Sequence, residues 1–323
     1  MKLHEEPDIF KDAVSLTAES MRLPEIYVEK DYWVTLALHR IFTSPLAEFV
    51  VFKGGTALAK CHAFIKRFSE DVDLVVVKDP ALTANQLKQR LKAISNAVAE
   101  VLPEIEREGI TNKKGMIRKT AHSYSQVFAG EFGQVRDMII LESSWLGSPE
   151  PTERSKVSSL VYDMMVAKRQ DALAEEYGLT PFGVSILAPT RTLCEKIMSL
   201  VRFSHTPEPV SDLRNKIRHV YDLHQLLQQQ DMALFFQSAA FDQMLHKVAQ
   251  DDEVSFRNNK EWLYHHPAHA LVFADLEKIW PQLRATYNGR FKSLVYGDLP
   301  DEQLIWGSLS KIGERLQKIE WKV

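Results

Sequence analysis

Apolar positions recur at helical spacing through the first forty residues of the chain. The period of about 3.6 residues predicts one helix over residues 7–22 and a second over residues 26–42, separated by Pro24. The second helix carries Glu29, Lys30 and Asp31 in succession on its otherwise apolar pattern. We expect these three side chains to form a solvated polar face.

Short apolar runs follow and alternate with further helical stretches. Residues 49–52 and 72–77 predict two core strands, and a helix is expected between them from Gly54 to about Ile65. A helix is expected over residues 83–101.

Further strands are predicted at residues 122–129, 135–143 and 182–187. Residues 157–166 fit a helix or a strand equally well. From Pro189 onward the apolar spacing is helical, including one long helix from Leu213 to Gln230.

This order of elements predicts the fold class and the domain boundary. An α/β (α+β) N-terminal domain with a small mixed sheet flanked by helices is expected over residues 1–188, followed by a mainly α-helical domain over residues 189–323.

The composition is typical of a globular protein and does not by itself indicate a function. The 323 residues are 45% hydrophobic and 26% charged, with a net charge of −3, so nucleic-acid contacts would require a local basic patch. The two cysteines suit a reducing cytosol. Charges fill the N-terminus, and no apolar run approaches the roughly 20 residues of a membrane span. A cytoplasmic protein with no membrane contact is expected.

Candidate chemistry lies in the run from Val50 to Val77. Gly54-Gly55-Thr56 precedes a predicted helix, where backbone N–H groups can bind phosphate. Asp71 and Asp73 are two residues apart in a strand and therefore share a face, where like charges repel unless a cation intervenes. Hard carboxylate oxygens suit Mg²⁺.

A third carboxylate, Glu142, ends the predicted strand at residues 135–143. With Asp71 and Asp73 on a neighbouring strand, it could hold two Mg²⁺ ions about 4 Å apart, as in phosphoryl transfer. The order of these motifs predicts a metal–nucleotide site.

The chain resembles the nucleotidyltransferase fold of DNA polymerase β and, more closely, the AbiEii/AbiGii toxin family, which includes the MenT toxins. The similarity covers roughly residues 25–230. The matching segments are EKDYWV (29–34), FKGGTALAK (52–60), RFSEDVDLVV (67–76), LESSW (141–145), LCEKIMSL (193–200) and RHVYDLHQL (218–226).

The resemblance implies roles for individual residues. Asp71, Asp73 and Glu142 would bind the catalytic Mg²⁺ ions. The nucleoside triphosphate would be held by the following residues: Lys53, Gly54, Gly55, Thr56, Ser69 and Lys196.

Lys196 and Asp222 match the family's helical lysine and the acidic residue of its tyrosine–aspartate–leucine motif, and both would be catalytic. They would face the other residues across an interdomain cleft to which the helical domain contributes. A structural Lys196–Asp222 salt bridge is an open alternative. His219 departs from the family pattern, because many members have an aspartate there.

The implied function is that of a bacterial toxin of a toxin–antitoxin or phage-defence system. It would transfer a nucleoside monophosphate from a triphosphate to RNA, with the tRNA 3′ end as the expected acceptor and a cognate antitoxin as partner. Two alternatives stay open, a small-molecule nucleotidyltransferase of the aminoglycoside type and a catalytically silent nucleotide- or RNA-binding module. The basic stretch at 107–119 fits a solvated loop or an RNA contact.

Overall fold

The structure is a computed structural model that describes residues 1–130, 135–256 and 258–322. Two compact units account for the chain. Unit 1 comprises Met1–Ala63, Phe68–Trp145 and Thr152–Ile186. Unit 2 comprises Phe64–Arg67, Leu146–Pro151 and Leu187–Val323.

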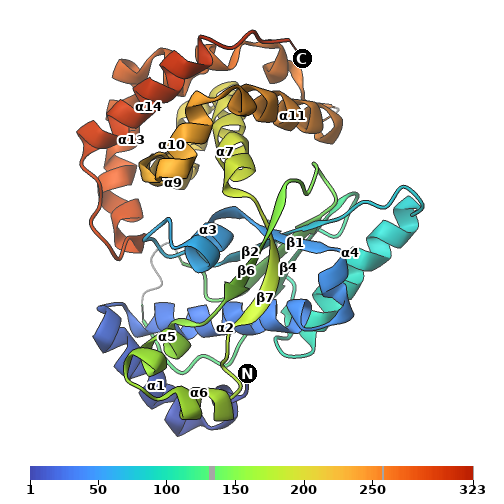
Figure 1. Ribbon diagram of the computed structural model, residues 1–323, viewed down its shortest axis with the longest axis vertical. Helices are drawn as coiled ribbons and strands as arrows, with labels where there is room; N and C mark the ends of the chain where they lie inside the picture. Colours follow the sequence, from blue (N-terminus) through green and yellow to red (C-terminus); the bar gives the residue numbers. More distant parts are fainter. Residues whose placement is uncertain (131–134, 257, 323) are drawn as a thin grey trace. The chain divides into compact units, whose positions relative to one another are not determined.

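Unit 1 is built on a mixed sheet that has seven strands in the described residues, in the order β3-β4-β5-β2-β1-β7-β6 (Figure 1). The strands are β1 (Val50–Lys53), β2 (Asp71–Val76), β3 (Glu104–Ile105), β4 (Ile117–His122), β5 (Ile139–Ser144), β6 (Thr152–Val157) and β7 (Phe182–Leu187). At its centre β2 runs antiparallel to β1 and parallel to β5. The predicted mixed sheet is confirmed.

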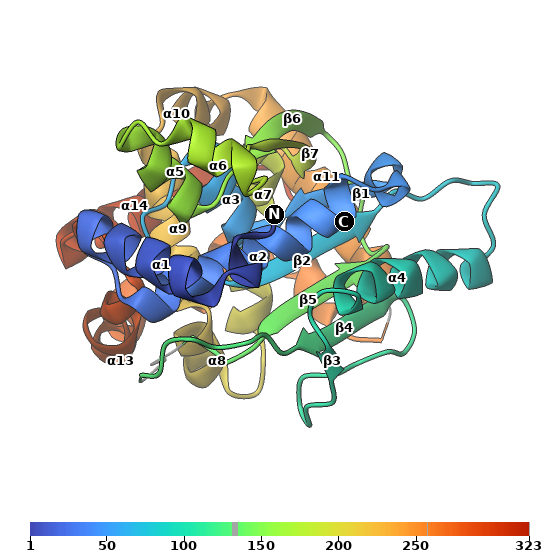
Figure 2. The same ribbon diagram turned by 90° about the horizontal axis from the view of Figure 1, so that it is seen from below.

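The helices of unit 1 cover this sheet. They are α1 (Pro7–Met21), α2 (Glu25–Phe42), α3 (Gly54–His62), α4 (Ala84–Ala99), α5 (Leu160–Ala167) and α6 (Asp171–Glu176). Helix α2 packs against β2 and β5, and α1, α4 and α5 pack against α2 (Figure 2). Because α2 has neighbours on several sides, nearly its whole length is buried.

The charged residues of α2 are buried, so the expected solvated polar face is wrong. Glu29 accepts hydrogen bonds from the backbone N–H groups of Val127 (2.7 Å) and Phe128 (3.1 Å). Each bond satisfies a backbone donor of the segment that packs on α2. The carboxylate thus holds residues 127 and 128 on the helix.

Asp31 joins two further segments to α2. Its Oδ1 atom accepts a hydrogen bond from Lys60 Nζ at 2.5 Å, and its Oδ2 atom accepts one from the N–H of Leu160 at 2.8 Å. Leu160 is the first residue of α5, so the carboxylate also satisfies a donor at a helix N-terminus. Helix α2 can bury these charged side chains because each of them has hydrogen-bonding partners in a neighbouring segment.

Two strand predictions need correction. The strand expected at 122–129 is wrong, because β4 ends at His122 and takes its first three residues from the basic stretch. Pairing with β5 selects this register, in which Lys119 lies opposite Glu142. Residues 157–166, left open by the sequence, contain the end of β6 and most of α5.

Unit 2 is helical, as predicted, and is formed mainly by residues after β7. Its α-helices are α7 (Pro189–Ser204), α8 (Pro209–Asn215), α9 (Ile217–Gln228), α10 (Gln230–Gln237), α11 (Ala239–Ser255), α12 (Leu271–Ala274), α13 (Leu276–Thr286) and α14 (Glu302–Leu316). Helix α7 packs against α8, α9, α11 and α12. The single helix expected over 213–230 is wrong, because the chain breaks at Lys216 into α8 and α9.

None of the described helices is both long enough and apolar enough to cross a membrane.

Two ion pairs on α2 should differ sharply in their contribution to stability. Asp31–Lys60 is buried, whereas Arg40–Glu100 (2.6 Å) is exposed. We expect Asp31→Ala to lower the free energy of unfolding by about 3–5 kcal/mol, because it leaves a buried ammonium without its counterion. Arg40→Ala should cost less than about 1 kcal/mol. Urea unfolding followed by circular dichroism measures both, and equal losses would contradict the structural assignment.

Candidate active site

Three carboxylates come together on adjacent strands of unit 1, as the sequence predicted. The parallel register places Asp73 of β2 directly opposite Glu142 of β5. Asp71 lies two residues before Asp73 and therefore points to the same face of the sheet. Glu142 lies within β5 rather than at its end.

Crowding of these groups shifts the protonation of the central one. Burial raises the pKa of Asp73 to about 7, and the nearby carboxylates of Asp71 and Glu142 act in the same direction. Lys53 and Lys119 oppose that shift through their positive charges. Asp73 therefore binds a proton near neutral pH unless another cation takes its place.

Cationic side chains accompany all three carboxylates. Lys119 Nζ lies 3.0 Å from Glu142 Oε2, and Arg136 Nη1 lies 3.1 Å from Asp71 Oδ1. Lys53 lies opposite Asp73 in the β1–β2 ladder. No three His, Cys, Asp or Glu side chains in the described ranges converge as a ready-made metal site. The carboxylate oxygens of Asp71, Asp73 and Glu142 are hard ligands that suit a divalent cation, so the residue types match those of a metal site.

The glycine turn is packed directly against this cluster. Gly54 has a φ of +82°, and a Cβ atom built on it would lie 2.5 Å from Asp73 Oδ2. Both the left-handed backbone and the close approach require glycine. Helix α3 begins at this residue, so its first backbone N–H groups, which have no intrahelical acceptors, lie beside the carboxylates.

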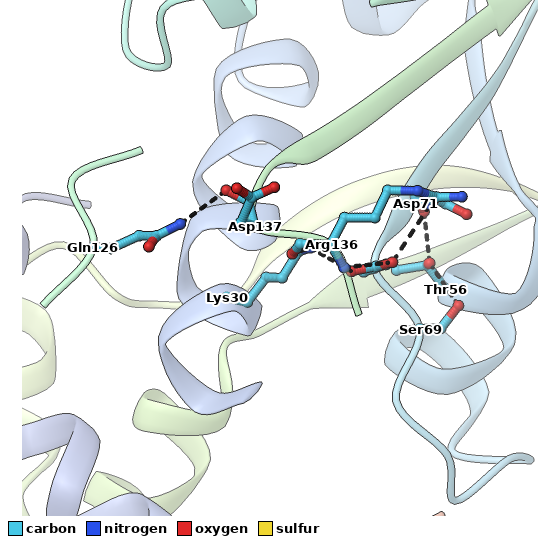
Figure 3. Close-up of polar contacts among 8 residues, drawn as sticks. Lys30, Thr56, Ser69, Asp71, Gln126, Arg136 and Asp137 are labelled. Atoms are coloured by element: carbon cyan, nitrogen blue, oxygen red, sulfur yellow. Dashed lines mark hydrogen bonds and ion pairs between the residues drawn. The ribbon is translucent and has the colours of Figure 1, made fainter. Parts of the chain in front are cut away.

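Thr56 ties the turn to the strand that carries the aspartates. Its hydroxyl donates to the carbonyl oxygen of Asp71 at 2.6 Å and lies 3.0 Å from Ser69 Oγ (Figure 3). The Thr56 side chain is buried. Any phosphate contact of Thr56 would therefore use its backbone N–H, while its hydroxyl holds α3 against β2.

Unit 2 contains the two helical residues singled out by the sequence. Asp222 of α9 is fully buried and accepts hydrogen bonds from Lys196 Nζ (2.7 Å) and from Nε and Nη2 of Arg67 (2.7 Å each). Burial would raise the pKa of Asp222, but Arg67 and Lys196 hold it well below its ordinary value. The predicted alternative, a Lys196–Asp222 salt bridge, is present.

His219 lies on the same helix as Asp222. Burial, with Lys196 and Lys216 as positive neighbours, lowers its pKa well below the ordinary value, so the ring is neutral. Among the described residues, the Nδ1 atom of His219 has no hydrogen-bond partner. A neutral ring thus stands where many members of the resembled family carry an aspartate.

Three cations of these clusters were not identified from the sequence. Arg67 was visible within the RFSEDVDLVV segment, but its partner lies 155 residues later. Lys119 was counted only as part of a basic stretch, and nothing in the sequence marked Arg136 beside Asp71.

Three of the five basic side chains in the stretch at 107–119 have carboxylate partners outside it, and Lys119 with Glu142 is one of them. Lys113 contacts Glu104 and Glu106, and Arg118 contacts Glu104. These contacts favour a structural role over an RNA contact for this stretch.

The comparison with protein families decides the chemistry. The family described as "Nucleotidyl transferase AbiEii toxin, Type IV TA system" matches residues 36–318. The chain belongs to the AbiEii nucleotidyltransferase toxin family. It is therefore a nucleotidyltransferase of the toxin–antitoxin class, and such enzymes act on a nucleoside triphosphate with a divalent metal ion. No curated protein matches.

Two solved structures resemble this AbiEii protein over most of its length. One is MenT4, the nucleotidyltransferase toxin Rv2826c from Mycobacterium tuberculosis H37Rv, with 15% identity, a TM-score of 0.46, and coverage of 93% of this chain and 98% of that chain. Another is JHP933 from Helicobacter pylori, with 15% identity, a TM-score of 0.41, and coverage of 92% and 95%.

The raised pKa of Asp73 predicts a pH-dependent stability of the metal-free protein. The folded-state pKa lies above the unfolded value, so ionised Asp73 destabilises the fold as pH rises from about 4 to 7. We expect Asp73→Asn to be more stable than the parent by about 1–3 kcal/mol at pH 8, with the difference shrinking toward pH 5. Thermal unfolding in chelator measures it. Asp12→Asn, at an exposed position of α1, should show no such trend.

The Asp222 cluster predicts that its two helical residues, Lys196 and Asp222, differ in their contribution to the free energy of unfolding. Asp222→Asn leaves Arg67 and Lys196 without a buried counterion and should cost about 3–5 kcal/mol. Lys196→Met keeps the bidentate Arg67–Asp222 pair and should cost roughly 1 kcal/mol. Guanidinium unfolding compares them, and a larger loss in Lys196→Met would show that Lys196 is the main partner of Asp222.

Proposed function

We propose that this AbiEii enzyme transfers a nucleoside monophosphate from a nucleoside triphosphate to RNA, in a reaction that depends on Mg²⁺. We further propose the 3′ end of tRNA as the acceptor. The observation that carries the proposal is the in-register set of Asp71, Asp73 and Glu142 beside the Gly54 turn.

The triphosphate would be bound at the start of α3. Backbone N–H groups of Gly54, Gly55 and Thr56 supply donors for phosphate oxygens, and Lys53 supplies a positive charge. Ser69, whose Oγ lies 3.0 Å from Thr56 Oγ1, belongs to the same binding surface.

Asp71, Asp73 and Glu142 would hold the metal. Two Mg²⁺ ions bound to them would supply Lewis acidity at the attacking and leaving oxygens. The acceptor hydroxyl oxygen bonds to the α-phosphorus, the bond from that phosphorus to the bridging oxygen breaks, and pyrophosphate leaves. The hydroxyl proton passes to solvent.

Lys196 and Asp222 are proposed to act together. An ammonium group has three N–H donors. The hydrogen bond to Asp222 uses one of them, and the group keeps its positive charge, so Lys196 retains the chemistry needed to bind a phosphate. Asp222 is fully buried and would act by orienting Lys196. In this proposal the positive charge of Lys196 offsets negative charge that develops on the phosphates.

The acceptor is inferred from the toxin class. A toxin must inactivate a component that its host needs, and the 3′-terminal hydroxyl of tRNA is a nucleophile required for aminoacylation. We propose that residues 189–323 form a domain that binds this acceptor, while residues 1–188 form the catalytic domain. A cognate antitoxin is the implied protein partner.

The decisive experiment is incubation of the full chain with total tRNA and each α-labelled triphosphate in turn, with Mg²⁺ and with chelator. We expect label on RNA with at least one nucleotide, and a loss of at least about 100-fold in Asp71→Asn and Asp73→Asn. Transfer by these variants at the parent rate would refute the proposed metal ligands.

Parallel reactions separate the alternatives. Label on an aminoglycoside but not on RNA would favour the small-molecule enzyme. Binding of a triphosphate without transfer to either acceptor would favour a silent nucleotide-binding module. Lys196→Met tests the helical lysine, because a fall in transfer of about 100-fold with a stability loss of only about 1 kcal/mol is expected for a phosphate ligand but not for a purely structural residue.

A further inference from the structure

Arg136 reaches one of the metal-binding aspartates from the segment that leads into β5. Its Nη1 atom lies 3.1 Å from Asp71 Oδ1 and 3.5 Å from Glu70 Oε1 (Figure 3). The Arg136 side chain is 42% exposed while it contacts the carboxylate. This cation is thus close to the reacting groups and still accessible to a ligand.

A buried ion pair holds the main chain of Arg136 in place. The Arg136 N–H donates to Glu70 Oε2 at 3.0 Å, and its carbonyl oxygen accepts a hydrogen bond from Lys30 Nζ. Lys30 and Glu70 also pair with each other, and their side chains are 0% and 2% exposed. Both main-chain polar groups of one surface residue are therefore fixed by charges buried beneath it.

Neutralising Asp71 would not require the buried Lys30–Glu70 pair that binds the main chain of Arg136. Burying an ion pair costs free energy unless its hydrogen bonds are well satisfied, and here they are satisfied by the peptide groups of residue 136. Glu142 is neutralised without such support, by Lys119 from the neighbouring strand. The buried pair therefore fixes the backbone from which one guanidinium is presented.

The charge balance changes when substrate arrives. Divalent cations on the three carboxylates would remove the attraction that holds Arg136 on Asp71, because metal and guanidinium compete for the same oxygen. The triphosphate brings close to four negative charges to the same place. A planar guanidinium matches phosphate oxygens in a bidentate way that an ammonium does not.

We propose that Arg136 is a triphosphate-binding residue that leaves Asp71 when the metal binds and then contacts a phosphate group of the incoming nucleotide. The inference rests on the proposed nucleotidyl transfer. It predicts opposite effects on two ligands. Arg136 opposes metal binding in the absence of nucleotide, and it promotes triphosphate binding once metal is present. A residue that only stabilised the fold would not change the two affinities in opposite directions.

The test measures binding by the full chain, with Mn²⁺ as the metal probe and inorganic tripolyphosphate as the phosphate probe. In Arg136→Gln we expect Mn²⁺ alone to bind about threefold to tenfold tighter, and metal–tripolyphosphate to bind about tenfold weaker at saturating Mn²⁺. Arg136→Lys should fall between the parent and Arg136→Gln for tripolyphosphate. Arg154→Gln removes the same charge at an exposed position of β6 and should change neither affinity.

The outcomes separate this inference from the proposed function. Unchanged tripolyphosphate affinity in Arg136→Gln, or a parallel loss of both affinities, would overturn the role of Arg136. If the parent shows both binding reactions and Arg136→Gln shifts them in opposite directions, the inference stands even if no label reaches RNA. In that case only the proposed acceptor chemistry fails.

Discussion

Repulsion among three carboxylates on two neighbouring strands is the constraint around which unit 1 is arranged. Asp73 and Glu142 face each other across a parallel ladder, and Asp71 shares their side of the sheet. The chain compensates with Lys53, Lys119 and Arg136, one from each of three different segments. Like-charge crowding of this kind is unfavourable for folding, and it supplies the attraction for a divalent cation.

Helix α2 is the second determinant of the architecture, because its charges fix chain segments that are far apart in sequence. Glu29 binds residues 127 and 128, Lys30 binds the peptide of residue 136, and Asp31 binds Lys60 and the start of α5. Each contact satisfies a polar group that packing removes from water. Strand β2, which carries Asp71 and Asp73, is thus packed against a helix that also holds the loops around it.

The sequence predicted the elements whose signal is local. Helical spacing located α1, α2, α4 and α7, and the Gly-Gly-Thr turn and the paired aspartates marked the site from their own neighbourhood. The missed features depend on residues distant in sequence. Strand β4 is selected by its ladder with β5 rather than by its own composition, which is basic at Arg118 and Lys119.

In the candidate site, too, the residues with a local sequence signal were predicted and those that depend on distant partners were missed. Carboxylates and glycines could be assigned by residue type and spacing, and the close approach of Gly54 to Asp73 gives a steric reason for the glycine. Arg67, Lys119 and Arg136 could not be assigned, because lysines and arginines are abundant and their partners are set by tertiary packing. Arg67 and Arg136 each find a carboxylate that only the folded chain brings within reach.

The short segment Phe64–Arg67 belongs to unit 2 although the residues on either side of it belong to unit 1. During synthesis, every residue of unit 1 is available once Ile186 has been made, whereas Arg67 must wait for Asp222. A fragment of residues 189–323 would retain Lys196 and Asp222. It would lose Arg67, whose guanidinium neutralises the buried Asp222 carboxylate. The helical part of the enzyme is therefore not a module that can be transplanted by cutting the chain once.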